Sequence, residues 1–66
     1  MAIMKVIEVL AQSESSWEDA TQVALNEAAR SVRHIKSIYI QEFQAIVKDN
    51  KIAQYRVNAK ISFEVE

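Results

Sequence analysis

The clearest pattern in the chain is a strict alternation of apolar and polar residues near its C-terminus. The apolar positions of residues 53–66 are Ala53, Tyr55, Val57, Ala59, Ile61, Phe63 and Val65. A period of two places successive side chains on opposite faces of a β-strand. We therefore predict a strand with one apolar face and one polar face, the polar face presenting Arg56, Asn58 and Lys60.

Two earlier segments are also predicted to be strands. Residues 3–10, IMKVIEVL, are rich in β-branched and long apolar side chains. From Ile35 the period changes to two, and KDNK at residues 48–51 then favours a hairpin turn through Asp49 and Asn50. Strict alternation in this second strand places Ile35, Tyr39, Phe43, Ala45 and Val47 on one face, and Ile38, Ile40 and Ile46 on the other with Lys36, Glu42 and Gln44.

A helix is predicted between the first two strands. Ser15 stands three residues before Glu18, which is the spacing of a capping box. One helical face would carry an apolar stripe, flanked by Val23 and Leu25, that consists of Trp17, Ala20, Ala24, Ala28 and Val32. Because most of these side chains are small, the helix could lie close to the sheet.

The resulting order β-α-β-β indicates an α+β fold. If all strands are antiparallel, the third must lie in the middle, which gives the order 1-3-2 with the helix on one face. A helix of about 17 residues reaches roughly 25 Å, whereas strands of about 13 residues reach roughly 43 Å. The sheet should therefore extend past the helix and expose apolar residues and strand edges, which a closed symmetric assembly would cover.

Length and composition support an assembly. Residues 1–66 suffice for a single domain, and a chain of this size buries only about 60% of its surface. It has no cysteine and one histidine, His34, so neither disulfides nor zinc are expected to stabilise it. The net charge of −1 gives no reason to expect a nucleic-acid partner. No apolar run suggests a membrane span or a signal peptide, and we expect a cytoplasmic protein.

The sequence offers little for catalysis. It contains no glycine, so a phosphate-cradling loop is excluded and an enzyme is not expected. Trp17 could stack on a ligand, but its helical spacing favours packing. Acidic residues at the helix start, namely Glu14, Glu18 and Asp19, are interpreted as structural. A basic cluster near the helix end consists of Arg30, Arg33, His34 and Lys36. We interpret it as capping the helix rather than as a phosphate-binding patch.

Three segments in this order carry a family resemblance: KVIEVLAQSESSWEDA, RHIKSIYIQEF and YRVNAKISFEVE. Together they resemble the dodecins, small flavin-binding proteins. The resemblance implies a β-α-β-β subunit, a hollow homododecamer of 23 symmetry and no catalytic activity. It also implies that riboflavin or FMN is held in pairs at two-fold axes between tryptophans, for storage.

The resemblance implies a flavin site at Ser37, Gln44, Ile46 and Arg56. The stacking tryptophan of the family corresponds to Ser37, which has no π-face. The glutamine that bonds the flavin edge corresponds to Arg56, which has no acceptor. We therefore expect weak flavin binding, or a shell that binds another small ligand, an anion or a metal ion at its symmetry axes. Facing Arg56 pairs could hold an anion, or carboxylates such as Glu42 or Glu64, or form an intersubunit ion pair.

Overall fold

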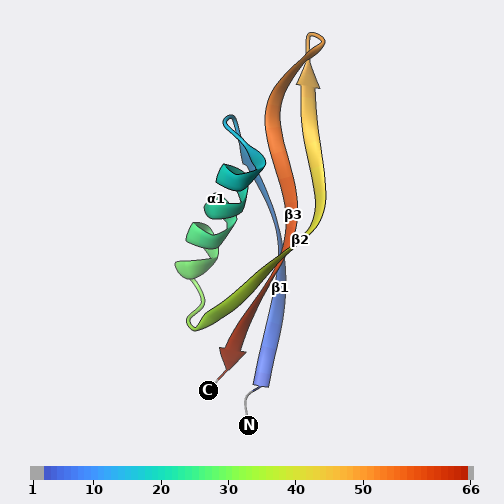
Figure 1. Cartoon of the computed structure of the whole chain (residues 1–66). Helices are drawn as coiled ribbons and strands as arrows, with labels where there is room; N and C mark the ends of the chain where they lie inside the picture. The colour runs from blue at the N-terminus through green and yellow to red at the C-terminus, as the bar shows by residue number, and fades with distance from the viewer. Residues whose placement is uncertain (1–2, 66) are drawn as a thin grey trace.

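The computed structural model describes residues 3–65 and confirms the predicted order of elements. The elements are β1 (Ile3–Ser13), α1 (Trp17–Ala29), β2 (Ile35–Lys48) and β3 (Lys51–Val65). Figure 1 shows α1 lying along one side of a long, twisted sheet. The protein therefore has the predicted α+β architecture of one helix on one sheet.

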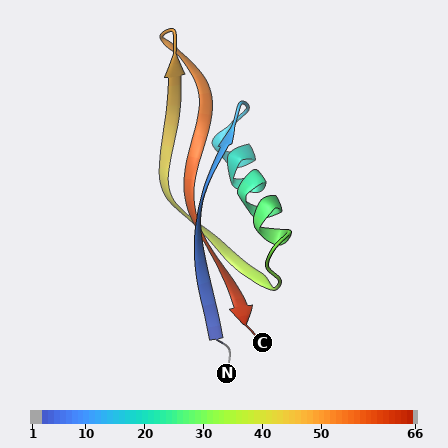
Figure 2. The same ribbon diagram turned by 180° about the vertical axis from the view of Figure 1, so that it is seen from behind.

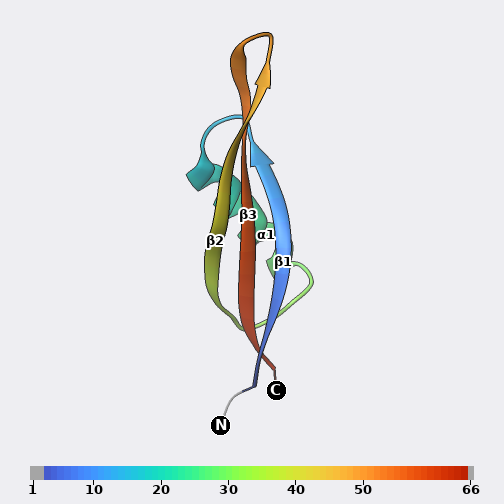
Figure 3. The ribbon, with the colours of Figure 1, turned by 90° about the vertical axis from the view of Figure 1, so that its right-hand side faces the viewer.

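The three strands form one antiparallel sheet in the predicted order β1-β3-β2. In Figure 3, β3 runs between its two neighbours and α1 lies behind them. The pairing of β1 with β3 is regular, from Ile3 opposite Val65 to Ser13 opposite Tyr55. β1 is thus longer than the predicted segment 3–10, because Ala11 to Ser13 continue the ladder.

The core lies between α1 and the apolar face of β3. Val57, Ala59 and Ile61 are fully buried on this strand. The helix contributes the buried residues Ala20, Ala24 and Ala28. Their small side chains let the helix backbone approach the central strand closely, as the alanine stripe predicts. Partly buried side chains that complete the packing are Val9, Trp17, Val23, Ile38 and Ile40.

The helix begins one residue later than predicted. Its N-cap is Ser16, whose hydroxyl accepts a hydrogen bond from the N–H of Asp19 at 2.9 Å. Ser15 instead donates its backbone N–H to the hydroxyl of Ser13 at 2.9 Å, and that hydroxyl donates to Asp19 Oδ2 at 2.6 Å. The predicted Ser15–Glu18 capping box is therefore wrong, because the end of β1 holds Ser15 outside the helix.

The helix is also shorter than predicted, with 13 residues. The N–H groups of Ser31 and Val32 both donate to the carbonyl of Ala28, which closes the last turn. His34 then takes a left-handed conformation, with φ of 62°, where the chain reverses into β2. Val32 therefore lies beyond the helix. No helix within residues 3–65 is long and apolar enough to cross a membrane.

The predicted faces of β2 are wrong for Ile38, Tyr39 and Ile40, because the strand is irregular on both sides of this segment. The register shifts between Ile35 and Ser37 and again between Ile40 and Glu42. Each irregularity adds one residue to β2 relative to β3 and reverses which face the following side chains occupy. As a result the helix-facing positions are Ile35, Ile38, Ile40, Phe43 and Ala45, and the opposite positions are Ser37, Tyr39, Glu42, Gln44 and Ile46.

The hairpin of β2 and β3 extends well beyond the helix, as predicted from the lengths of the strands and the helix. Asp49 and Asn50 form its turn with φ of 53° and 61°. Two consecutive positive φ angles are typical of a type I′ turn, whose twist matches that of the strands. The molecule measures 50 × 19 × 14 Å. Figure 2 shows the same overhang from behind, with the hairpin rising past the start of α1.

Candidate ligand site

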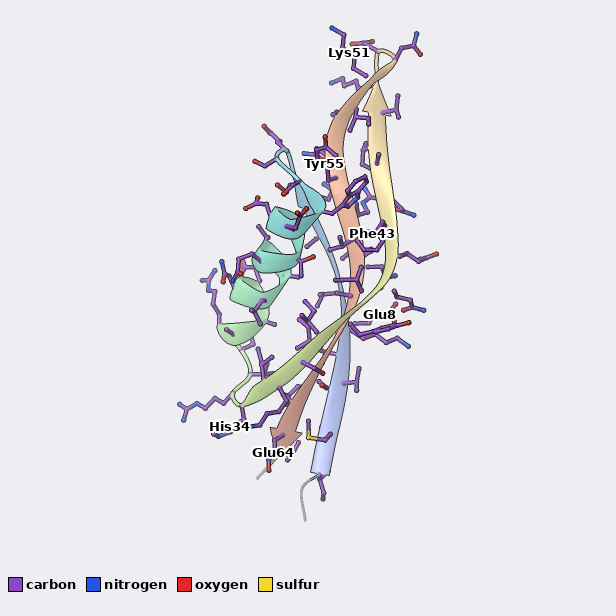
Figure 4. The ribbon with its side chains drawn as sticks, viewed as in Figure 1. Glu8, His34, Phe43, Lys51, Tyr55 and Glu64 are labelled. Carbon is purple, nitrogen blue, oxygen red and sulfur yellow. The ribbon has the colours of Figure 1, made fainter. Side chains whose placement is uncertain are left out.

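The far face of the sheet, which is the face away from α1, carries all four residues implied as a flavin site. Residues opposite one another on antiparallel strands share a face, so the register defines the rows across this surface. Figure 4 shows one of its residues, Glu8, on the side of the sheet away from α1. Starting at the hairpin, the rows are Gln54–Ile46, Gln12–Arg56–Gln44, Leu10–Asn58–Glu42, Glu8–Lys60–Tyr39 and Val6–Ser62–Ser37.

Arg56 is at the centre of a hydrogen-bond network that spans all three strands. Its Nε donates to Gln12 Oε1 at 2.7 Å, and its Nη2 donates to the same oxygen. On the other side its Nη1 donates to Gln44 Oε1 at 3.4 Å. Gln12 Nε2 in turn donates to Gln54 Oε1 at 2.8 Å. The guanidinium is thus fixed between two amide oxygens.

Gln44 connects this network to the helix on the other face. Its backbone carbonyl accepts a hydrogen bond of 2.9 Å from the indole N–H of Trp17. The indole also packs edge-on against Phe43 and Tyr55, with ring centroids 6.0 and 4.9 Å away. Figure 4 shows Phe43 and Tyr55 beside the start of α1. The prediction that Trp17 serves packing is confirmed.

Ser37 lies far from the other implied site residues within one chain. It is opposite Ser62, and the two hydroxyls are hydrogen-bonded. Ser62 is six residues from Arg56 along β3, or about 20 Å at about 3.3 Å per residue. The structure therefore brings Gln44, Ile46 and Arg56 to one end of the far face and leaves Ser37 at the other.

Two members of the Arg56 network were missed by sequence reasoning. Gln54 belongs to the polar side of the alternating strand, so its face was predictable. Gln12 was missed because the first strand was predicted to end at residue 10. Its place two residues after Leu10 in the same strand would have been the available signal.

Several charged groups elsewhere have structural partners. The carboxylate of Asp19 accepts a hydrogen bond from Ser13, and Arg30, at the C-cap, pairs with Glu27 at 3.2 Å. Lys36 Nζ is 3.7 Å from Glu64. No group of three or more His, Cys, Asp or Glu side chains that could hold a metal ion occurs within residues 3–65. A metal site formed by one chain alone thus has no support in the described part of the structure.

The open edge of β1 borders a groove of about 560 Å³ between the strand and α1. Its walls are mainly apolar and include Val9, Leu10 and Val23. Gln12, Glu27 and Arg56 also line it, so the groove reaches the polar network and contains one carboxylate, which pairs with Arg30. The groove places an uncovered apolar surface directly beside the guanidinium.

The chain is similar to known proteins over almost its full length. The family model described as Dodecin matches residues 3–66. A dodecin from Thermus thermophilus is 27% identical over 64 residues, covering 97% of this chain and 93% of the relative. The calcium dodecin of Mycobacterium tuberculosis is 33% identical over 66 residues, covering 98% of this chain and 92% of the relative.

Solved structures agree with this assignment. A crystal structure of a Thermus thermophilus protein superimposes with a TM-score of 0.94 and 26% identity, covering 100% of this chain and 97% of that one. The crystal structure of the Mycobacterium tuberculosis calcium dodecin, described as having a novel calcium-binding site, gives a TM-score of 0.85 and 30% identity, with coverage of 97% and 91%. The sequence match and the shared β-α-β-β subunit together show that this chain belongs to the dodecin family.

Proposed function

We propose that this protein is a non-enzymatic, cytoplasmic binding protein that assembles into a hollow homododecamer and holds a small ligand on the far face of its sheet. Membership of the dodecin family makes it a small oligomeric ligand-binding protein. The observation that carries the site is the Gln12–Arg56–Gln44 network, because its hydrogen bonds hold a partly exposed charged group in place on the far face.

The assembly is supported by the apolar surface that one subunit leaves uncovered. Leu10 and Val6 on the far face are 66% and 58% exposed, and Ile52 near the hairpin tip is 56% exposed. Both outer strands, β1 and β2, also have an unpaired edge. Surfaces of this kind favour association with further copies of the chain.

Flavin is a poor fit to this far face. Ser37 offers a hydroxyl that is already bonded to Ser62, and no ring for stacking. Tyr39 is the one aromatic side chain that the register places on the far face within residues 3–65, and it is 64% exposed. Loss of an aromatic contact costs about 0.5–1.5 kcal/mol beyond its buried area, and symmetry would repeat the loss. We therefore propose weak binding of riboflavin and FMN.

A fluorescence titration tests the flavin part of this proposal. Riboflavin at fixed concentration is mixed with increasing amounts of the purified protein, and quenching of flavin emission reports stacking. We expect little quenching at low micromolar protein and partial quenching only at higher concentrations. Strong quenching at nanomolar protein would contradict the proposal, because it would require a complete stacking site.

The second candidate is a shell that binds another small ligand, an anion or a metal ion at its symmetry axes. The observation that favours an anion is Arg56, whose hydrogen-bond partners within residues 3–65 are all neutral amide oxygens. The metal alternative rests on the similarity to the calcium dodecin. Native mass spectrometry of the purified assembly distinguishes these candidates by the mass that each ligand adds.

A further inference from the structure

The guanidinium of Arg56 has no counterion within the described part of the chain. The ion pairs recorded for residues 3–65 involve other cations, in Arg30–Glu27 and Lys36–Glu64. Arg56 is partly buried and is hydrogen-bonded to neutral amides. If the far face is covered, the guanidinium loses hydrating water. This loss destabilises the covered state unless an opposite charge compensates for it. Whatever covers Arg56 should therefore be negatively charged.

The hydrogen-bond geometry leaves donors free for such a group. A guanidinium has five N–H donors. One on Nε, one on Nη1 and one on Nη2 are directed at Gln12 and Gln44, so one donor remains on each terminal nitrogen. Paired donors of this kind suit the two oxygens of a carboxylate or of a phosphate group.

The surrounding amides add donors rather than acceptors. Because a guanidinium only donates, Gln12 and Gln44 must turn their oxygens toward it. The amide nitrogen of Gln12 then donates to Gln54 Oε1. The amide nitrogen of Gln44 has no protein partner within residues 3–65, and it lies in the same row as Arg56. The row therefore offers an excess of hydrogen-bond donors to a ligand.

We propose that Arg56, assisted by the amide of Gln44, is an oxyanion site that binds the carboxylate or phosphate group of a small ligand. This inference rests on the proposed function, since it names the chemistry of the ligand held on the far face. The two remaining guanidinium N–H donors bind two oxygens of the anion, and the Gln44 amide donates to it from one side. The apolar groove beside Arg56 accommodates nonpolar parts of the ligand.

Two carboxylates compete with a free anion for this role. Glu42 lies one row away on β2 and makes no recorded ion pair with Arg56. A carboxylate from a second copy of the chain could also reach the guanidinium in the assembly. In that case Arg56 would hold subunits together instead of binding a ligand, and its removal would dissociate the assembly.

Calorimetric titration of the assembled protein with inorganic phosphate, and separately with acetate, tests the proposal. Ionic strength is kept constant with sodium chloride, so general screening does not change. We expect saturable binding of at least one of the two anions by the unmodified protein. Arg56→Gln should weaken it about tenfold to a hundredfold, as expected for loss of charged hydrogen bonds. Arg33→Gln, the same exchange at an exposed position away from the network, should leave the affinity unchanged.

Three outcomes would overturn the oxyanion site. These are no saturable binding of either anion, equal affinity in Arg56→Gln, or a fall in assembly mass caused by Arg56→Gln. If Arg56→Gln does not fold, Arg56→Lys keeps the charge but lacks the paired donors, and it should still bind several-fold more weakly. Riboflavin binding and assembly mass are measured on the unmodified protein in parallel, so failure of the proposed function is recognised separately from failure of the anion site.

Discussion

Trp17 and Gln44 are joined by a hydrogen bond of 2.9 Å from the indole N–H to the backbone carbonyl. The bond links the first residue of α1 to β2, across the gap between helix and sheet. The side chain of the same glutamine bonds Arg56 on the opposite face. Gln44 thereby connects the hydrophobic core to the candidate ligand site. Substitutions on the core side should therefore alter the position of the Gln44 side chain at the site.

Replacement of Trp17 by phenylalanine tests this link. The ring would keep most of its packing against Phe43 and Tyr55 but would leave the Gln44 carbonyl without its donor. We expect a loss of about 0.5–1.5 kcal/mol in the free energy of unfolding per subunit. Urea denaturation followed by circular dichroism, at one protein concentration, measures the change. Trp17→Ala should cost clearly more, since it also removes the aromatic packing, and an unchanged stability of Trp17→Phe would contradict the role of the hydrogen bond.

The start of the helix gives a second test. Ser16→Ala removes the side chain that accepts from Asp19, so the protein should lose about 0.5–2 kcal/mol of stability. Ser15→Ala is the matched control, because only the backbone N–H of Ser15 is bonded here. Thermal denaturation at fixed concentration should show a lower midpoint for Ser16→Ala alone. A larger effect at Ser15 would instead support the capping box expected from sequence.

The hairpin turn depends on a backbone conformation that few residues tolerate. Asn50 has a φ of 61°, and left-handed conformations cost an ordinary residue about 1–2 kcal/mol. Asn50→Ala should therefore destabilise the protein by up to about that amount. Asn50→Gly should not, because glycine adopts positive φ freely. Urea denaturation of the two variants side by side measures the difference, and equal stabilities would argue against a type I′ turn.

Ser37 should be the position at which flavin affinity can be restored. Ser37→Trp places an indole on the far face where the family resemblance implies one, and we expect riboflavin affinity to rise at least about tenfold. Quenching of flavin fluorescence measures it. Tyr39→Trp is the matched control, since it enlarges an aromatic ring two residues away on the same face. A similar gain from both variants would show that the position of the ring is unimportant.

Most of the fold could be predicted from the sequence because its strongest signals are periodic. The alternation in β3 and the alanine stripe of α1 both identified buried faces correctly, and Asp49 and Asn50 identified the turn. β2 was harder, because an added residue leaves no mark in composition yet reverses the face of the side chains that follow, here until the second added residue restores it. Tyr39 was therefore placed on the wrong face.

The candidate site was predictable only in part. The resemblance gave Gln44 and Arg56, and the strand order makes them neighbours. The orientation of the amides could not be foreseen, since it follows from the contact with the guanidinium. Ser37 was grouped with them by resemblance, although one chain keeps it at the other end of the far face. Such residues can share a site only where subunits meet.

Assembly is the property to test first, because covering of the far face requires further subunits. Sedimentation equilibrium of the purified protein measures the mass directly, without assumptions about shape. For a subunit of 7.5 kDa we predict a homododecamer of about 90 kDa that persists on dilution to low micromolar concentration. A stably folded monomer of 7.5 kDa under the same conditions would contradict the account.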